Sequence, residues 1–322
     1  MSSVLILGGT AWLGQEIARQ AVLAGHDVTC VARGESGDAP DGVRFIRADR
    51  SLPGALQHVN GEWDAVIELA YEPGLVAVAL DAFADRAGHW SFVSTISVYA
   101  SHDVAGADES APLVDPVDTE DYGQAKVAAE LLTRERVGDR LLITRPGLIA
   151  GPGDPSDRFG YWPGRFARGG RVLAPAMSGH VQVIDVADLA RWLLDAHQWN
   201  LIGTVDAVGP SIPMAAFFAR LRAATAHGAD IVEAPHPWLR EQGVNYWAGP
   251  RSMPLWLPEA DAALTQRSGV RLRELGGSIR PIDETIARVI EDETERGLWR
   301  TRRSGLTPRE EEELLELLRD RV

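Results

Sequence analysis

The stretch Val4-Leu5-Ile6-Leu7-Gly8-Gly9-Thr10-Ala11-Trp12-Leu13-Gly14 decides the fold of this chain. Its apolar run from Val4 to Leu7 is typical of a strand that is buried on both faces of a parallel sheet. The glycine-rich turn then leads into apolar residues at helical spacing, which end at Gly25. The stretch therefore predicts a strand, a tight turn and a helix.

Glycines in such a turn let the backbone approach a pyrophosphate, and the amides at the N-terminus of a helix favour its negative charge. Gly8 and Gly14 fit the outer positions of a G-x-x-G-x-x-G turn, while Ala11 takes the middle position and narrows the approach. Because the turn follows the first strand of an alternating pattern, nucleotide binding is favoured over a purely structural role. We expect nucleotide contacts from Gly8, Thr10, Trp12, Leu13 and Gly14.

Strand and helix patterns alternate downstream of this turn. Further strands are predicted over 27–32, 43–47, 64–69, 89–94 and 140–144, and helices over 75–84 and 121–137. Such alternation is typical of an α/β fold with a doubly wound parallel sheet, the Rossmann arrangement. We expect a dinucleotide-binding domain over 1–147 plus about 181–210, a substrate-binding lobe over 148–180 and about 211–300, and a C-terminal helix over 301–322.

Composition limits the classes of function. The chain has 322 residues, of which 45% are hydrophobic and 24% charged, as in an ordinary globular protein. Its net charge of -14 opposes broad binding to nucleic acid or to an anionic membrane, where a basic surface supplies the affinity. No apolar run approaches the ~20 residues of a membrane helix, and the N-terminus lacks the basic region of a signal peptide. We expect a soluble cytoplasmic enzyme with a small-molecule substrate, either a monomer or a homodimer.

Cysteine and histidine usage argues against a disulfide or a zinc site. Cys30 is the only cysteine, and its place in a predicted strand indicates a small buried hydrophobe. The histidines show no metal spacing. The acidic runs 291–295 and 310–313 are interpreted as solvent-facing helix surfaces, so no metal is expected.

The end of the second predicted strand bears on the type of nucleotide. NAD-specific sites place a carboxylate there to hold the ribose hydroxyls, whereas Val31-Ala32-Arg33-Gly34 contains none. Arg33 can pair with a 2'-phosphate through two N–H groups, so NADP is favoured, with NAD as the alternative. A solvent-exposed arginine is the other interpretation of Arg33. Asp49 and Arg50 are expected to border the adenine, Arg50 being either a second phosphate contact or surface charge, and Ala70 completes the expected cofactor contacts.

Tyr122-Gly123-Gln124-Ala125-Lys126 lies at the start of the helix predicted over 121–137. Four residues apart on a helix, the phenol and the ammonium share one face, so the cation can stabilise phenolate. A tyrosine in that setting can act as a general acid or base. The same spacing also occurs on solvated helix faces, so the rest of the chain must decide between the two interpretations.

Three motifs stand in a recognisable order: Gly8-Gly9-Thr10-x-x-Leu13-Gly14, Ser94-Thr95-Ile96-Ser97-Val98-Tyr99 and Tyr122-x-x-x-Lys126. In this combination the chain resembles the extended branch of the short-chain dehydrogenase/reductase superfamily, which includes nucleotide-sugar epimerases and dehydratases. The resemblance covers most of residues 1–200. It implies that Thr95 holds the substrate oxygen, with Ser94 and Ser97 as alternatives. It further implies that Tyr122 transfers the proton and that Lys126 binds the nicotinamide ribose.

The chain departs from the family pattern in two places. Ile96-Ser97 stands where dehydratases carry an Asp-Glu pair, which argues against dehydratase chemistry, and the middle glycine of the turn is missing. The GGTxxLG turn with Asp49-Arg50 also resembles a less typical subgroup that includes chloroplast RNA-binding relatives. The net charge of -14 argues against RNA binding by this chain.

Three functions remain in competition. The first is an NADP-dependent reductase or dehydrogenase that transfers hydride to or from a small carbonyl or alcohol. The second is a nucleotide-sugar epimerase, and the third is a non-catalytic NADP-binding sensor or scaffold. Arg33 and the missing carboxylate favour the first, while substrate and reaction direction stay open.

The smaller lobe is rich in aromatic residues that the sequence places in loop-like contexts. They either wall an apolar or planar substrate or pack the lobe itself. Three arginines are candidates for an anionic substrate group, although solvated surface is the favoured interpretation for at least two of them. The residues are Trp162, Trp238, Tyr246, Trp247 and Trp256, the arginines Arg158, Arg165 and Arg168, and two candidate pocket residues, His180 and Gln182.

Overall fold

The computed structural model describes residues 1–320, which divide into two compact units. Unit 1 comprises Met1–Leu148, Val186–Gly209 and Arg267–Ile279. Unit 2 comprises Ile149–Asp185, Pro210–Gln266 and the chain from Arg280 onward. The division differs from the expected boundaries because 181–185 belongs to unit 2, whereas 267–279 belongs to unit 1. Positions 321 and 322 of the expected C-terminal helix lie outside the described residues.

Unit 1 is built on a seven-stranded sheet in the order β10-β6-β5-β4-β1-β2-β3, with parallel pairing throughout. The sheet confirms the predicted α/β, Rossmann-like fold, and its order reverses between β1 and β4. β10 is a strand that the sequence did not indicate. The strands are β1 Ser3–Leu7, β2 Asp27–Ala32, β3 Arg44–Arg47, β4 Trp63–Glu68, β5 Ala87–Val93, β6 Leu141–Pro146 and β10 Gly203–Ala207.

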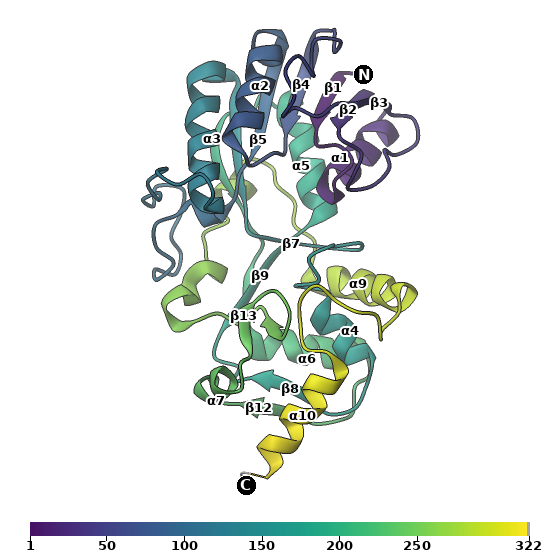
Figure 1. The fold of residues 1–322 in the computed structure, drawn as a ribbon, viewed down its shortest axis with the longest axis vertical. Helices are drawn as coiled ribbons and strands as arrows, with labels where there is room; N and C mark the ends of the chain where they lie inside the picture. Colours follow the sequence, from purple (N-terminus) through teal and green to yellow (C-terminus); the bar gives the residue numbers. More distant parts are fainter. Residues whose placement is uncertain (321–322) are drawn as a thin grey trace. The chain divides into compact units, whose positions relative to one another are not determined.

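Helices cover both faces of this sheet (Figure 1). α1 (Trp12–Leu23) packs beside α5 (Val186–Gln198), and α2 (Pro73–Phe83) packs beside α3 (Tyr122–Val137). α8 (Val270–Glu274) lies against β10. Between the sheet and the α2/α3 pair lies a core that includes Leu80, Phe83, Trp90 and Phe92, all at most 1% exposed. Burying each such side chain contributes roughly 1.5–3 kcal/mol.

Local chemistry sets the ends of the elements that carry the expected site. The Asp121 side chain accepts a hydrogen bond from Gln124 N at the start of α3, and Gly138, with φ of +66°, ends that helix. The turn after β1 rests directly on β2, because an ideal Cβ at Gly9 would lie 2.3 Å from Cys30 Sγ. Burial raises the pKa of the Cys30 thiol to about 12.

Unit 2 combines short strands with helices around an aromatic core. Trp162, Phe166, Phe217 and Phe218 are almost fully buried there, and α4, α6 and α9 pack on one another. Its strands form a three-stranded sheet, β11-β9-β7, and the pairs β12-β8 and β13-β14. The elements are β7 Leu148–Ala150, α4 Tyr161–Ala167, β8 Val172–Pro175, β9 His180–Asp185, β11 Ser211–Pro213, α6 Met214–Ala224, β12 Ile231–Ala234, α7 His236–Glu241, β13 Asn245–Trp247, β14 Ser252–Pro254, α9 Ile282–Arg296 and α10 Pro308–Arg319.

Several surface predictions for unit 2 were wrong. Arg165 and Arg168 are largely buried and pair with Glu311, at 2.6 and 2.7 Å. Glu311 itself is buried although it belongs to an acidic run expected to face solvent, and so is Glu293, which pairs with arginines. The described residues contain no group of acidic, His or Cys side chains that could hold a metal ion. Within residues 1–320, no helix is long and apolar enough to cross a membrane.

Candidate active site

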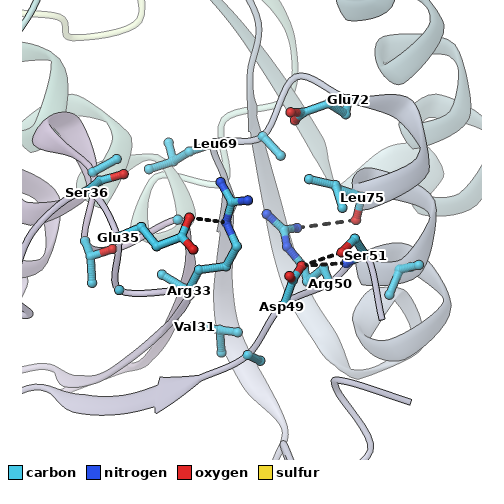
Figure 2. Close-up of a pocket in the computed structure, with 18 of the residues that line it drawn as sticks. Val31, Arg33, Glu35, Ser36, Asp49, Arg50, Ser51, Leu69, Glu72 and Leu75 are labelled. Carbon is cyan, nitrogen blue, oxygen red and sulfur yellow. Dashed lines mark hydrogen bonds and ion pairs between the residues drawn. The ribbon is translucent and has the colours of Figure 1, made fainter. Parts of the chain in front are cut away.

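A cavity of about 740 Å³ lies in unit 1 at the carboxyl ends of β1, β2, β3 and β4 (Figure 2). Parallel sheets bind ligands at this edge, beside the point where the strand order reverses. The wall is formed by the turns that follow these strands and by the first part of α2. The lining residues lie at positions 8, 10, 11, 31–36, 48–51, 69–72, 74, 75 and 78.

The turn after β1 brings backbone segments into close contact. Gly8 has φ of +98°, which glycine adopts without strain. An ideal Cβ at Gly14 would lie 2.4 Å from Gly8 O, so α1 can begin against the turn only with glycine there. Gly8 and Thr10 line the cavity, whereas half-buried Trp12 and Leu13, together with Gly14, are not lining residues. The N-terminus of α1 follows directly on this wall, and its dipole favours a negatively charged group there.

Arg33 reaches the cavity from the end of β2, and Glu35 pairs with it (Figure 2). Arg33 Nε lies 3.3 Å from Glu35 Oε2, and the two side chains are 61% and 63% exposed. The strand end contains no acid, but the loop that follows it folds Glu35 back into the same cavity. The cavity therefore holds an exposed cation and an exposed carboxylate side by side, and water screens the pair.

Arg50 is held by Glu68, a fully buried carboxylate at the end of β4. Arg50 Nη1 lies 2.5 Å from Glu68 Oε2, and Nη2 lies 3.1 Å from Oε1. Glu68 Oε1 also accepts a hydrogen bond from Ala70 N at 2.8 Å. The charge of Arg50 is therefore already paired, and the pair fixes the turn after β4. Beside it, hydrogen bonds from Ser51 lower the pKa of the Asp49 carboxyl.

Lys126 is a buried cation at the same edge of the sheet. Its Nζ donates hydrogen bonds to Ala70 O at 2.9 Å and to Val93 O at 2.5 Å. An ammonium carries three N–H groups, so one remains for a ligand hydroxyl. Burial lowers the pKa of Lys126 to about 8, and the negative charge of Glu68 opposes this shift. Ala70 connects the two features, because it lines the cavity and binds the lysine.

The start of α3 contacts the turn that follows β5. An ideal Cβ at Gly123 would lie 2.5 Å from Ser97 O, so a larger residue would push the two segments apart. Tyr122, the first residue of α3, is 47% exposed, and its ring meets Tyr71 edge-on with 5.6 Å between centroids. The phenol is therefore accessible to a ligand beside the turn of residues 95–98.

Thr95 and Ser97 form a hydroxyl pair in this turn. Thr95 Oγ1 accepts a hydrogen bond from Ser97 N at 3.1 Å and donates one to Ser97 Oγ at 3.2 Å. Thr95 is buried and Ser97 is exposed, so the Ser97 hydroxyl is the one that meets solvent. Ser94 Oγ is buried and has no hydrogen-bond partner among residues 1–320.

A buried ionic network, which the sequence did not indicate, supports this turn. Arg145 donates to both carboxylate oxygens of Glu130, at 2.8 and 2.6 Å, and to Tyr99 Oη at 3.0 Å. Tyr99 Oη donates to Asp206 at 2.6 Å, and the other oxygen of Asp206 accepts from Arg267 at 2.7 Å. The network joins α3, β6 and β10 to the loop after β5.

Two carboxylates near this cavity, Glu35 and Glu68, were not singled out from the sequence. Glu35 left no signal, because only the path of a loop brings it to the cavity. Glu68 did leave one, since it is an acid that ends an otherwise apolar strand. Glu35 lines the cavity and pairs with Arg33, whereas Glu68 lies outside the lining and pairs with Arg50, which does line it.

No protein-family model and no curated protein matches the sequence, whereas solved structures match its fold. The UDP-Glc/GlcNAc 4-epimerase from Campylobacter jejuni matches with a TM-score of 0.70 at 14% identity, covering 92% of this chain and 100% of that one. The chain therefore shares the fold of this epimerase.

Two further solved structures share this fold and match at similar levels. The UDP-glucose 4-epimerase from Thermotoga maritima, solved with UDP-glucose, has a TM-score of 0.66 at 18% identity and covers 91% of this chain and 99% of its own. WbmF from Bordetella bronchiseptica, solved with NAD+, has a TM-score of 0.65 at 15% identity. The match covers 92% of this chain and 93% of WbmF.

Proposed function

We propose that the chain is an NADP-dependent oxidoreductase that transfers hydride to or from a small carbonyl or alcohol. The observation that carries this proposal is the position of Lys126. Its buried ammonium is bound to Ala70 O, at the wall of a nucleotide-sized cavity, and it lies on the helix that begins with accessible Tyr122. A structural lysine would be expected to pair with a carboxylate. Lys126 instead donates to two backbone carbonyls, and its third N–H group can bind a ligand.

The residues of the cavity fit a nicotinamide dinucleotide. The turn after β1, where Gly8 and Thr10 line the cavity, suits a pyrophosphate beside the N-terminus of α1. Arg33 suits a 2'-phosphate, and the remaining N–H of Lys126 suits a ribose hydroxyl. When bound, the nicotinamide supplies or accepts a hydride.

The chain's own residues handle the substrate proton. In the direction of reduction, Tyr122 Oη gives its proton to the substrate oxygen as that oxygen gains negative charge. The cationic Lys126 on the same helix face stabilises the phenolate that remains. The Thr95–Ser97 hydroxyl pair donates a hydrogen bond that orients the substrate oxygen. In the direction of oxidation, the proton returns to Tyr122.

Removing Arg33 should weaken NADP binding selectively. We expect Arg33→Ala to lower the affinity for NADPH by about 10- to 100-fold, the effect of losing a charge-assisted phosphate contact, and to leave NADH affinity unchanged. Glu35→Gln should strengthen NADPH binding and weaken NADH binding, because it removes a carboxylate from the same place. Isothermal titration with NADPH, NADP+, NADH and NAD+ measures both effects.

Arg44→Ala is the matched control, since Arg44 is an exposed arginine at the opposite end of β3. It should change none of the affinities. Tighter binding of NADH than of NADPH, unaffected by either cavity variant, would disprove the proposed preference for NADP.

A nucleotide-sugar epimerase is the second candidate, favoured by the activities named for the matching structures from Campylobacter jejuni and Thermotoga maritima. An epimerase oxidises and re-reduces one sugar without net redox change, so it needs no added reductant. NMR of UDP-glucose incubated with the protein and NAD+ tests this candidate. Accumulation of a 4-epimer without net formation of NADH would favour it over the first function.

A further inference from the structure

Lys126 is the only lysine among the 32 lysine and arginine residues of the chain. Its side chain is buried, with Nζ 4.9 Å from the centre of the Phe92 ring, and burial lowers its pKa to about 8. In the proposed reaction this amine has to carry its proton and keep one N–H group for the ligand. The residues that set its position and its charge therefore bear directly on turnover.

Glu68, at the end of β4, is connected to Lys126 through a single residue. Glu68 Oε1 accepts a hydrogen bond from Ala70 N at 2.8 Å, and Ala70 O accepts one from Lys126 Nζ at 2.9 Å. The carboxylate thus holds one side of Ala70 while the ammonium binds the other. The second acceptor for Lys126 is Val93 O at the end of β5, the strand that pairs with β4. Glu68 therefore helps to fix one of the two carbonyls that orient the amine.

Arg50 in turn holds Glu68 in one orientation. Both carboxylate oxygens accept from its guanidinium, at 2.5 and 3.1 Å, and the two side chains are 0% and 10% exposed for Glu68 and Arg50. Arg50 Nη1 also lies 3.4 Å from Leu75 O in the first turn of α2. A bidentate pair of this kind restricts the carboxylate more than a single hydrogen bond does.

Three carboxylates counteract the effect of burial on Lys126, and Glu68 counteracts it most. Glu130 lies four positions further along α3 and is itself paired with Arg145. Glu72 precedes α2 and is half-buried. The charged and titratable groups around Lys126 are therefore Glu68 with Arg50, Glu72, Glu130 with Arg145, and Tyr122 at the start of the same helix.

We propose that Glu68 is a positioning residue of this site, which fixes the carbonyl that binds Lys126 and supplies the negative charge that keeps its ammonium protonated. The consequence for turnover rests on the oxidoreductase function proposed above. The effect of Glu68 on Lys126 does not, because it can be measured without cofactor or substrate.

NMR titration of Lys126 tests the effect directly. Because the chain has one lysine, protein labelled with ¹³C at lysine Cε gives a single side-chain signal, whose pH dependence reports the protonation of Lys126. Glu68→Gln keeps an oxygen that can accept from Ala70 N but removes the charge. The midpoint should therefore move to lower pH, by about one unit. Glu135→Gln, at an exposed glutamate on the same helix, is the matched control and should leave the midpoint unchanged.

Turnover at two pH values separates the charge of Glu68 from a merely structural role. With the pKa of Lys126 near 8, a shift of about one unit lowers its protonated fraction about fivefold at pH 8 and hardly at all at pH 6. The kcat of Glu68→Gln for reduction of a small ketone by NADPH should fall in the same way. Glu68→Asp keeps the charge but shortens the side chain, so it should lower kcat by a similar factor at both pH values.

The double variant Glu68→Gln/Arg50→Met covers the case in which the single variant fails to fold, because it leaves no buried guanidinium without a partner. Its midpoint should lie between those of the wild type and Glu68→Gln. An unchanged midpoint in the variants, an equal loss of kcat at pH 6 and pH 8 in Glu68→Gln, or full turnover of Glu68→Asp would each overturn the proposal. If the midpoints move as expected but the wild type does not turn over NADPH with any ketone, the effect of Glu68 on Lys126 stands and the oxidoreductase function falls.

Discussion

Tyr122→Phe is expected to lower kcat by about 100- to 10,000-fold, the usual contribution of a positioned general acid or base. The affinity for NADPH should stay unchanged, because the phenol is at the start of α3 and does not line the nucleotide cavity. Steady-state oxidation of NADPH with a small ketone gives kcat, and isothermal titration gives the affinity. The loss should fall on kcat and not on KM, since phenylalanine keeps the ring and loses only the proton carrier.

Tyr71 offers a close control for this experiment. Its ring packs edge-on against that of Tyr122, it is 43% exposed, and it lines the nucleotide cavity. Tyr71→Phe should keep most of kcat. A Tyr122→Phe enzyme with full turnover would remove Tyr122 from the mechanism. An equal loss of kcat in both variants would show that turnover depends on the packing of the two rings and not on the Tyr122 proton.

Arg145→Met should lower the free energy of unfolding by about 3–5 kcal/mol, the cost of leaving a buried charge without its partner. The substitution leaves Glu130, which is 1% exposed, without its bidentate partner, and it also removes a donor to Tyr99. Guanidinium unfolding followed by far-ultraviolet circular dichroism measures the change. Turnover should fall too, because Tyr99 follows directly on the turn that holds Thr95 and Ser97.

Arg134→Met tests whether the burial of Arg145 is the cause of the large loss in the free energy of unfolding. Arg134 approaches the same carboxylate, at 3.9 Å, but its side chain is 44% exposed. Water screens such a pair, so its loss should cost less than about 1 kcal/mol. Equal losses for the two arginines would contradict the assignment of the buried network as the support of this loop.

The sequence was sufficient to predict secondary structure where residues close together in the chain determine the conformation. The strand, turn and helix of residues 3–23 and the Asp121-capped helix α3 follow from apolar runs, glycines and a capping side chain. β10 was missed because Gly203–Ala207 has no continuous apolar run. Its Asp206 is buried because two residues distant in the sequence, Arg267 and Tyr99, pair with its two oxygens.

Pairing between distant residues also explains the other errors. Arg165 and Arg168 look like surface arginines in the sequence, yet Glu311 lies more than 140 positions away and neutralises both in the interior. Trp162, expected in a loop, belongs to α4 and is fully buried against Phe218. Of the five aromatic residues singled out in the lobe, Trp256 lines a cavity of about 390 Å³ within unit 2, and Trp162, Trp238, Tyr246 and Trp247 do not line it.

Cys30 gives the nucleotide turn a built-in reporter. It is the only cysteine in the chain, its thiol is packed against Gly9, and burial raises its pKa to about 12. Alkylating reagents need an exposed thiolate, so the folded chain stays unlabelled until the first strand and turn separate. The rate of alkylation of Cys30 therefore measures how often that turn opens. A nucleotide bound at the turn lowers this rate in proportion to its occupancy.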